Sequence, residues 1–235
     1  LNGTGVNAAV VAPGASVTLD IVGDVTQNNT SCPGCITQFY ARMDGVFSLC
    51  LSSAVNSASV NKSTTFTAPT EPGVYHINRA SAWEMACNSS TSVSTSLSGI
   101  TIATLIVREE ATSYTSLGRT FYISESNMDS TETDWAVVER GSSTSYAIVG
   151  NVVQNNTNCP GCITQFYAQM NDVFGLCLGS STDGYNVDES ETFEAPETPG
   201  IYLVSPRATF KFSCDSSTTG SKTISSSTLG YLLVY

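Results

Sequence analysis

The residues most able to do chemistry in this 235-residue chain are its eight cysteines. They form two sets of four with the same spacing, and each set is a Cys-Pro-Gly-Cys pair followed by two single cysteines. The sets are Cys32, Cys35, Cys50 and Cys87, and Cys159, Cys162, Cys177 and Cys214. Four cysteines in this pattern could bind zinc, exchange thiols or form disulfides.

The rest of the sequence favours disulfides. Four-cysteine zinc sites usually offer a second close pair, whereas Cys50 and Cys87 stand 37 positions apart. A thioredoxin-like centre places its pair at a helix N-terminus, where the dipole lowers the thiol pKa. Here the pair runs directly into a strand pattern. The chain is also poor in Lys and rich in Ser and Thr, as exported proteins often are. We therefore expect no metal and no other cofactor.

Two pairings within each module remain open. A Pro-Gly turn brings Cys32 and Cys35 close enough to bond, which leaves Cys50 and Cys87 to join two strands. The other pattern pairs Cys32 with Cys87 and Cys35 with Cys50. In the loop-entropy model the long bridge of the first pattern contributes about 4 kcal/mol and the short one about 2 kcal/mol.

A shift of 127 positions carries one cysteine set onto the other, and the surrounding sequence follows without a gap. The same shift carries "FTAPTEPGVY" onto "FEAPETPGIY". We interpret residues 1–108 and 128–235 as two copies of one module. Residues 109–127 are then a linker, which contains the strand-like segment "RTFYIS".

The local patterns predict strands and almost no helix. "ITQFYARM" alternates, meets an Asp-Gly turn and returns as "VFSLCL". A two-residue turn would place Met43 opposite Val46 and Phe39 opposite Cys50. Short strands, Pro-Gly turns and one core per module predict an all-β chain of two tandem antiparallel β-sandwich modules, immunoglobulin-like and disulfide-stapled.

Composition excludes several kinds of partner. The net charge is −11, with only nine Lys plus Arg, whereas nucleic acids and anionic membranes require a basic surface. No apolar run approaches the roughly 18 residues that span a membrane. The chain opens with Leu rather than Met, which suggests a removed leader peptide. We expect an extracellular or cell-surface protein.

No catalytic constellation recurs in the two modules. His76 is the single histidine, and Leu203 stands at its repeat position. The chain has no nucleophile-elbow motif and no pair of carboxylates kept in both copies. The acidic run at residues 187–194 reads as a solvated edge strand, with a weak calcium site as the alternative. We expect that the protein is not an enzyme.

Two tyrosines could form a surface for sugars. Tyr40 and Tyr167 follow Gln38 and Gln165 by two positions, on the side opposite the neighbouring phenylalanine. A Tyr beside a Gln on a sheet could stack against a pyranose ring. The alternative is ordinary packing against a neighbouring strand or domain.

Six asparagines begin an Asn-x-Ser/Thr triplet and are candidate glycosylation sites. Two of them are repeat equivalents in a polar loop before the Cys-Pro-Gly-Cys pair. The candidates are Asn2, Asn28, Asn29, Asn61, Asn88 and Asn155. Covalent glycans, through N- or O-linkage, are therefore an expected addition to the chain.

The pattern "CPGCITQFY", a further cysteine, "FTAP-x-x-PG-x-Y" and "W-E-x-x-C" resembles a repeat of uncharacterised secreted microbial proteins. The second module departs from it at "FKFSC". The resemblance covers nearly all of both modules and implies export and a sandwich fold. More loosely, tandem sandwiches resemble subunits of extracellular, often glycosylated filaments and pili. This looser resemblance implies a structural subunit of a head-to-tail helical surface filament. The alternative is a secreted monomeric carbohydrate-binding or adhesion protein.

Assembly would then join copies of this chain to one another through exchanged strands. If the linker strand covers an edge of the second module, the first module lacks that cover, and a neighbouring copy could supply it. The candidate donors are the N-terminal segment at residues 6–14 and the linker. Their candidate assembly residues are Val6, Ala9, Val10, Val11, Phe121 and Ile123.

Overall fold

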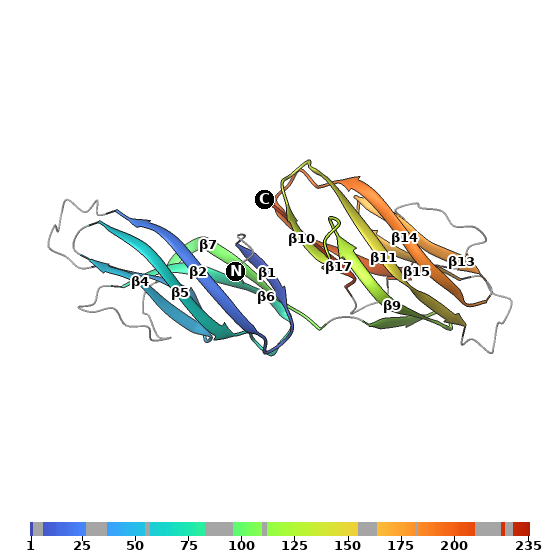
Figure 1. The fold of residues 1–235 in the computed structure, drawn as a ribbon, viewed down its shortest axis with the longest axis horizontal. Helices are drawn as coiled ribbons and strands as arrows, with labels where there is room; N and C mark the ends of the chain where they lie inside the picture. The colour runs from blue at the N-terminus through green and yellow to red at the C-terminus, as the bar shows by residue number, and fades with distance from the viewer. Residues whose placement is uncertain are drawn as a thin grey trace. The chain divides into compact units, whose positions relative to one another are not determined.

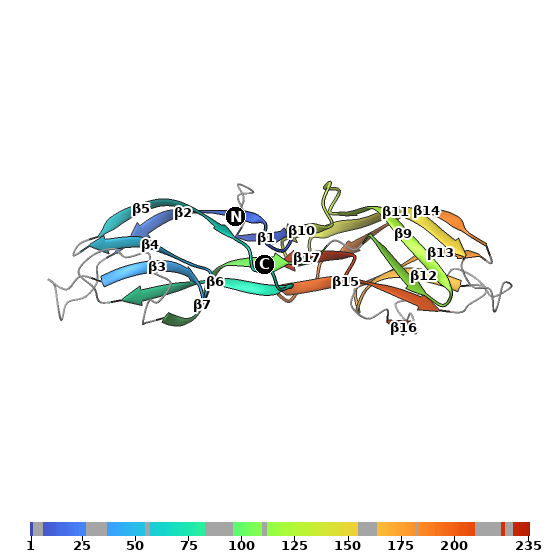
Figure 2. The same cartoon turned by 90° about the horizontal axis from the view of Figure 1, so that it is seen from below.

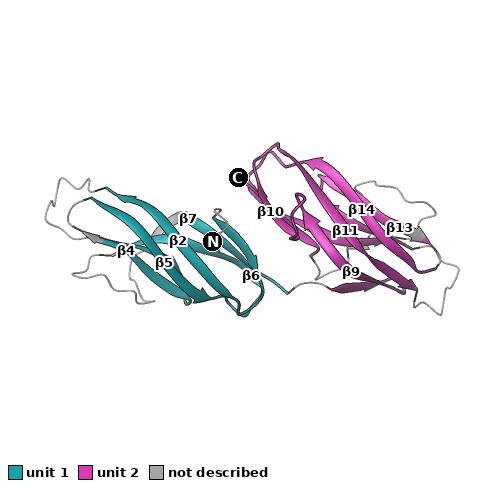
Figure 3. Ribbon diagram, viewed as in Figure 1, with its two compact units in different colours: residues 1–110 teal, residues 111–235 magenta. Residues whose placement is uncertain are grey.

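A computed structural model shows two compact units, Leu1–Glu110 and Ala111–Tyr235 (Figure 3). All regular elements in the described part of the chain are β-strands, so the predicted all-β class is confirmed. The structure describes residues 1, 7–26, 37–54, 57–82, 96–109, 112–154, 164–181, 183–209, 222–223 and 228–235.

The first unit is a sandwich of a five-stranded and a two-stranded sheet. The strand orders are β1-β7-β6-β3-β4 and β2-β5, and Figure 2 shows the two layers of the unit one above the other. Its strands are β1 (Ala8–Val11), β2 (Ser16–Val25), β3 (Thr37–Met43), β4 (Phe47–Ala54), β5 (Ala58–Thr67), β6 (Gly73–Ala82) and β7 (Ser96–Val107).

The second unit repeats this sandwich with a wider second sheet. The strand orders are β10-β17-β15-β12-β13, with β16 paired to β15, and β14-β11-β9-β8. Its strands are β8 (Ser113–Ser116), β9 (Arg119–Met128), β10 (Trp135–Val138), β11 (Ser143–Gln154), β12 (Thr164–Met170), β13 (Phe174–Ser181), β14 (Tyr185–Glu194), β15 (Gly200–Thr209), β16 (Lys222–Thr223) and β17 (Gly230–Val234).

Alternating apolar residues build each core between the two layers. In β2, Val17 and Leu19 are buried, and they belong to one cluster with Ile77 and Leu105 of the facing sheet. The strands pair antiparallel, with one parallel pair in each unit, β1 with β7 and β10 with β17. Both units are therefore β-sandwiches of mainly antiparallel strands, and the predicted fold class is confirmed.

Strands related by the 127-residue shift occupy the same place in the two units, and only β8 and β9 are additional. In the second unit these two strands form a hairpin on the edge of β11. The shift carries Met128, the last residue of β9, onto Leu1, and both side chains are buried in their cores. Residues 112–127, interpreted from the sequence as linker, are thus part of the second sandwich.

The hairpin between β3 and β4 differs from the sequence prediction by one residue. Met43 pairs with Phe47, so the loop holds three residues, and the Val46 amide donates to the Met43 carbonyl at 3.1 Å. Gly45 takes a positive φ of 72°, as a three-residue loop requires. The longer loop moves every partner by one position, so Tyr40 rather than Phe39 lies opposite Cys50, and the predicted pairing was wrong; a register shift between Phe39 and Tyr40 then places Phe39 opposite Ser52.

Cys50 and Cys177 are repeat equivalents, and both are disulfide-bonded. Cys50 lies in a small buried cluster with Tyr40 and Ala80, separate from the main core of the first unit. The other six cysteines lie outside the described residues, as does Trp83, so the two candidate pairings within a module both stand as predictions.

Candidate functional site

Strand β2 has one paired edge and one edge on which the structure places no described strand. Its paired edge bonds to β5 along its whole length, from Ser16 to Val25. The equivalent strand β11 pairs with β14 on one edge and with β9 on the other. Figure 1 shows this difference as β2 beside β5 in the first unit and β9, β11 and β14 side by side in the second. An unpaired edge of this length is a template for another strand.

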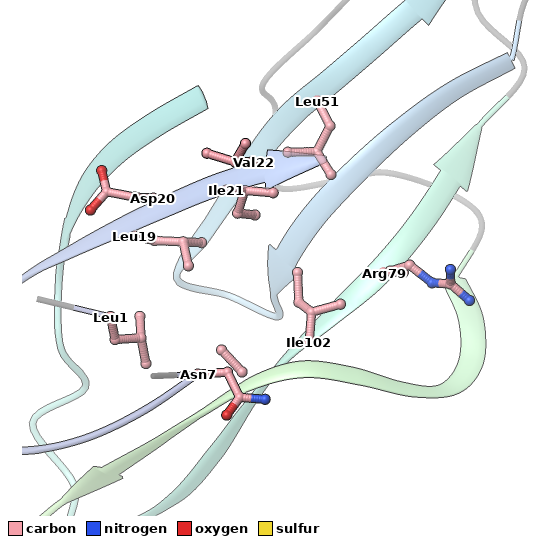
Figure 4. Close-up of a pocket in the computed structure, with 10 residues that line it drawn as sticks. Leu1, Asn7, Leu19, Asp20, Ile21, Val22, Leu51, Arg79 and Ile102 are labelled. Carbon is pink, nitrogen blue, oxygen red and sulfur yellow. The ribbon is translucent and has the colours of Figure 1, made fainter. Parts of the chain in front are cut away.

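An apolar groove of about 530 Å³ lies between β2 and the larger sheet. In Figure 4 the side chains of Leu1, Leu19, Ile21, Leu51 and Ile102 gather around this space. Asn7, Asp20, Val22, Arg79 and Ala103 complete its wall. The interior of the groove is thus built from aliphatic groups of both sheets.

The second unit shows what this groove looks like when a strand covers it. Six apolar residues of the first unit, of which Ile21, Leu51 and Ile102 line the groove, are only half-buried, whereas their repeat equivalents are at most 4% exposed. The pairs are Ile21 and Ile148, Val25 and Val152, Phe39 and Phe166, Leu49 and Leu176, Leu51 and Leu178, and Ile102 and Leu229. The first unit therefore has an incomplete core along one side of β2.

Aromatic side chains of the β8–β9 hairpin complete the second core. Tyr114 makes edge-on ring contacts with Phe121 and Phe166, with centroids 5.2 and 5.3 Å apart. Phe121 also stacks on Phe166 at 6.3 Å and is 0% exposed. Burial raises the pKa of the Tyr114 hydroxyl well above its ordinary value, so this ring stays neutral in the core at physiological pH.

The other half of β9 ties the two sheets of the second unit together. The Ser126 hydroxyl donates to the carbonyl of Leu229 at 2.8 Å and shares a hydrogen bond of 2.9 Å with the Tyr146 hydroxyl. In the first unit Leu19 and Ile102 stand at the positions of Tyr146 and Leu229. The first unit therefore lacks the hydroxyl group that Tyr146 offers to β9 in the second.

A repeated glycine marks where the covering strand passes. A Cβ on Gly150 of β11 would lie 2.2 Å from the Tyr122 carbonyl oxygen and 2.8 Å from the Phe121 ring, so β9 needs a glycine here. The shift carries Gly150 onto Gly23 of β2, where a Cβ would meet nothing within 4 Å. Glycine inside a strand costs about 0.5–1 kcal/mol relative to Ala. Gly23 is therefore not required by any described contact in the first unit, whereas Gly150 is required by the close approach of β9.

The predicted assembly residues lie in strands of their own units. Ala9 is buried, and Val10 and Val11 are half-buried in β1, which pairs with β7. Phe121 and Ile123 belong to the second core. The described parts of both candidate donor segments are thus paired within their own units, and the linker strand covers an edge of the second sandwich as considered from the sequence. Their part in assembly stays a prediction, and Val6 lies outside the described residues.

Of the two interpretations of Tyr40 and Tyr167, internal packing is confirmed and the sugar platform is wrong, because both side chains are buried. Tyr40 is 1% exposed and Tyr167 is 2% exposed. The Tyr167 hydroxyl donates to Oε1 of Gln165 at 2.5 Å, and Tyr40 donates to Gln38 in the same way. Both glutamines are fully buried as well. The Gln-x-Tyr pair is thus a repeated internal hydrogen bond, and it is one reason why this stretch recurs unchanged.

Other candidate sites are on the surface or beyond the described residues. His76 is exposed on β6, 3.4 Å from the Thr104 hydroxyl. The acidic run lies on β14, with only Val187 and Phe193 buried, and no cluster of metal-ligating side chains occurs among the described residues. Asn61 is exposed on β5, and the other five sequon asparagines lie outside the described residues. No helix among the described residues is long and apolar enough to cross a membrane.

Comparison with known proteins gives a weak structural likeness only. No protein family model and no curated protein sequence matches the chain. Two solved structures of a marsupial T cell receptor match at 10% and 12% identity, with TM-scores of 0.20 and 0.19. They cover 85% and 97% of this chain, and 64% and 70% of the receptor chain. The chain thus spans about two thirds of these receptor chains.

The groove itself was missed by the sequence patterns. Alternation predicts which residues of a strand face a core, but not whether that core is closed on every side. The pair of equivalent glycines, Gly23 and Gly150, was the available signal, because each interrupts a run of strand-forming residues. The role of Leu1 in the core could not be predicted either, since only the structure shows that its side chain takes the place of Met128.

Proposed function

We propose that this protein is an extracellular structural protein, a subunit that joins head to tail into a helical filament at the cell surface. The observation that carries this proposal is the incomplete core of the first unit beside the completed core of the second. A long strand edge next to an apolar groove is a ready site for another chain. In the second unit the equivalent edge of β11 is already paired with β9.

An asymmetric pair of units favours a filament over a closed dimer. The joint would use the first unit of one copy and a different surface of the next. Contacts between unlike surfaces generate open helical filaments unless the rotation closes a ring. Two anchoring side chains buried in the groove would contribute about 1.5–3 kcal/mol each, and main-chain hydrogen bonds to β2 would add specificity.

The cysteines support an extracellular location. The thiols of Cys50 and Cys177 are both oxidised to disulfides, which persist outside the cytosol and are rare within it. Asn61 presents an exposed sequon, so glycans could decorate the filament without disturbing the core. The rival function, a monomeric carbohydrate-binding protein, loses its proposed platform, because Tyr40 and Tyr167 are internal.

Negative-stain electron microscopy of the protein from its native source tests the proposal. We expect unbranched filaments of uniform width that label with an antibody against this chain. Single dispersed molecules at the concentrations found on the cell surface would contradict a structural role. An antibody that labels the cell surface without any fibre would instead support the adhesion protein.

A further inference from the structure

We propose that the groove along β2 is an acceptor site for an extended strand supplied by a second copy of this chain. The inference rests on the proposed function, and it adds the site, the direction and the side-chain pattern of the joint. The docked strand runs antiparallel to β2, because β9 runs antiparallel to the equivalent strand β11. It extends the two-stranded sheet β2-β5 by one strand.

Repeat equivalence gives the register of the docked strand. In the second unit Phe121 lies opposite Val152, and Ile123 lies opposite Gly150. Carried back by 127 residues, these partners are Val25 and Gly23. An aromatic residue therefore faces Val25, and an aliphatic residue two positions later faces Gly23, so that both side chains enter the groove.

Leu1 limits how far the strand extends. Its buried side chain takes the position that Met128 fills at the end of β9, against Leu19 in place of Tyr146. The docked strand therefore occupies the part of the groove beside Ile21, Gly23 and Val25. Val22, which is 81% exposed, lies on this stretch and is the most exposed of the large apolar residues described.

A second copy is the occupant that the observations favour. Within the described chain, the strand that fits such a groove is β9, and β11 engages it along its whole length. The fit of β9 to the repeat-equivalent groove shows that this chain contains a strand of the required pattern. Asp20 and Asp24 are exposed on β2, and Arg79 lies in the groove wall, so charges of both signs border the groove and its apolar interior decides the fit.

A peptide with the sequence of residues 112–128 tests the groove directly. Fluorescence anisotropy should show that the complete 235-residue chain binds one peptide per chain. The same peptide with Phe121→Asp and Ile123→Asp should not bind. In the protein, Gly23→Ala should weaken binding by about tenfold or more, because its Cβ would meet the docked main chain. Thr67→Val, an exposed change on β5, is the matched control and should leave binding unchanged. Failure of the wild-type peptide to bind would overturn the acceptor site.

A photo-cross-link identifies the source of the strand. A benzophenone amino acid replaces Val22, and copies labelled with ¹⁵N are mixed with unlabelled copies before assembly and irradiation. We expect cross-linked peptides that combine labelled and unlabelled segments, and we expect Gly23→Ala to abolish them. Cross-links confined to a single isotope would show that the strand comes from the same chain and would overturn the proposal.

The strand joint at β2 and the filament function can fail independently of each other. Filaments that form normally with Gly23→Ala would refute the joint and leave the filament function standing. Peptide binding without any filament in native material would refute the function and leave the acceptor site standing.

Discussion

The equivalent glycines Gly23 and Gly150 allow one substitution to be tested in two environments of the same chain. In the second unit, Gly150→Ala places a methyl group 2.2 Å from a carbonyl oxygen of β9 and 2.8 Å from the Phe121 ring. Main-chain atoms must move to relieve this overlap, and overpacking of this kind costs about 1–3 kcal/mol. In the first unit, Gly23→Ala meets nothing within 4 Å. It should stabilise the unassembled chain by about 0.5–1 kcal/mol, because Ala loses less conformational entropy in a strand.

Hydrogen exchange followed by mass spectrometry can assign each effect to its own unit. With Gly150→Ala, the amides of β8 and β9 should exchange about fivefold to 150-fold faster. With Gly23→Ala, the amides of β2 and β5 should exchange at the same rate or more slowly. Similar destabilisation by both substitutions in dispersed chains would refute the reasoning, because it would mean that β2 is already covered within the monomer.

Three further predictions follow from the second core and the internal polar pair. Phe121→Ala should cost about 3–5 kcal/mol in denaturant unfolding of the second unit, as for other buried aromatics, and a cost below 1 kcal/mol would contradict its place in the core. Burial raises the pKa of Tyr114 and of Tyr185 in the folded chain, so the folded state holds these protons more tightly. The contribution of these two tyrosines to stability should therefore be constant below about pH 10 and fall above it by roughly 1.4 kcal/mol per pH unit for each tyrosine, and Tyr114→Phe should remove its share of the slope. Tyr40→Phe leaves the buried Gln38 without this donor and should cost about 1–3 kcal/mol in thermal unfolding, whereas an unchanged midpoint would show that the hydrogen bond contributes nothing.

The repeat was readable from the sequence because the two copies align over their whole length without a gap. A shift of 127 residues relates β2 to β11, β5 to β14 and β6 to β15 without an insertion. Short alternating segments separated by Gly and Pro also sufficed to predict the β-sandwich class. These features depend on local residue patterns, and the two copies of the module show each pattern twice.

Loop length, burial of both faces of a sheet and the partner of the β8–β9 hairpin could not be predicted from local residue patterns. The Asp-Gly pair after Met43 fits a two-residue turn and also a three-residue loop, and the second closes the hairpin here. Tyr40 was assigned to an exposed face because alternation distinguishes two faces and does not show that both are covered. The hairpin of β8 and β9 was interpreted as a linker because its partner β11 follows it in the chain and belongs to the second repeat.

Protection of the β2 amides on assembly tests the central claim most directly. Hydrogen exchange of Ser16–Val25 should be compared between dispersed chains and assembled native material, with β5 as an internal reference. If a neighbouring copy places a strand on the open edge, amides of β2 become strongly protected on assembly, while those of β5 change little. Equal exchange of β2 in dispersed and assembled chains would show that this edge stays open, and that the subunits join elsewhere.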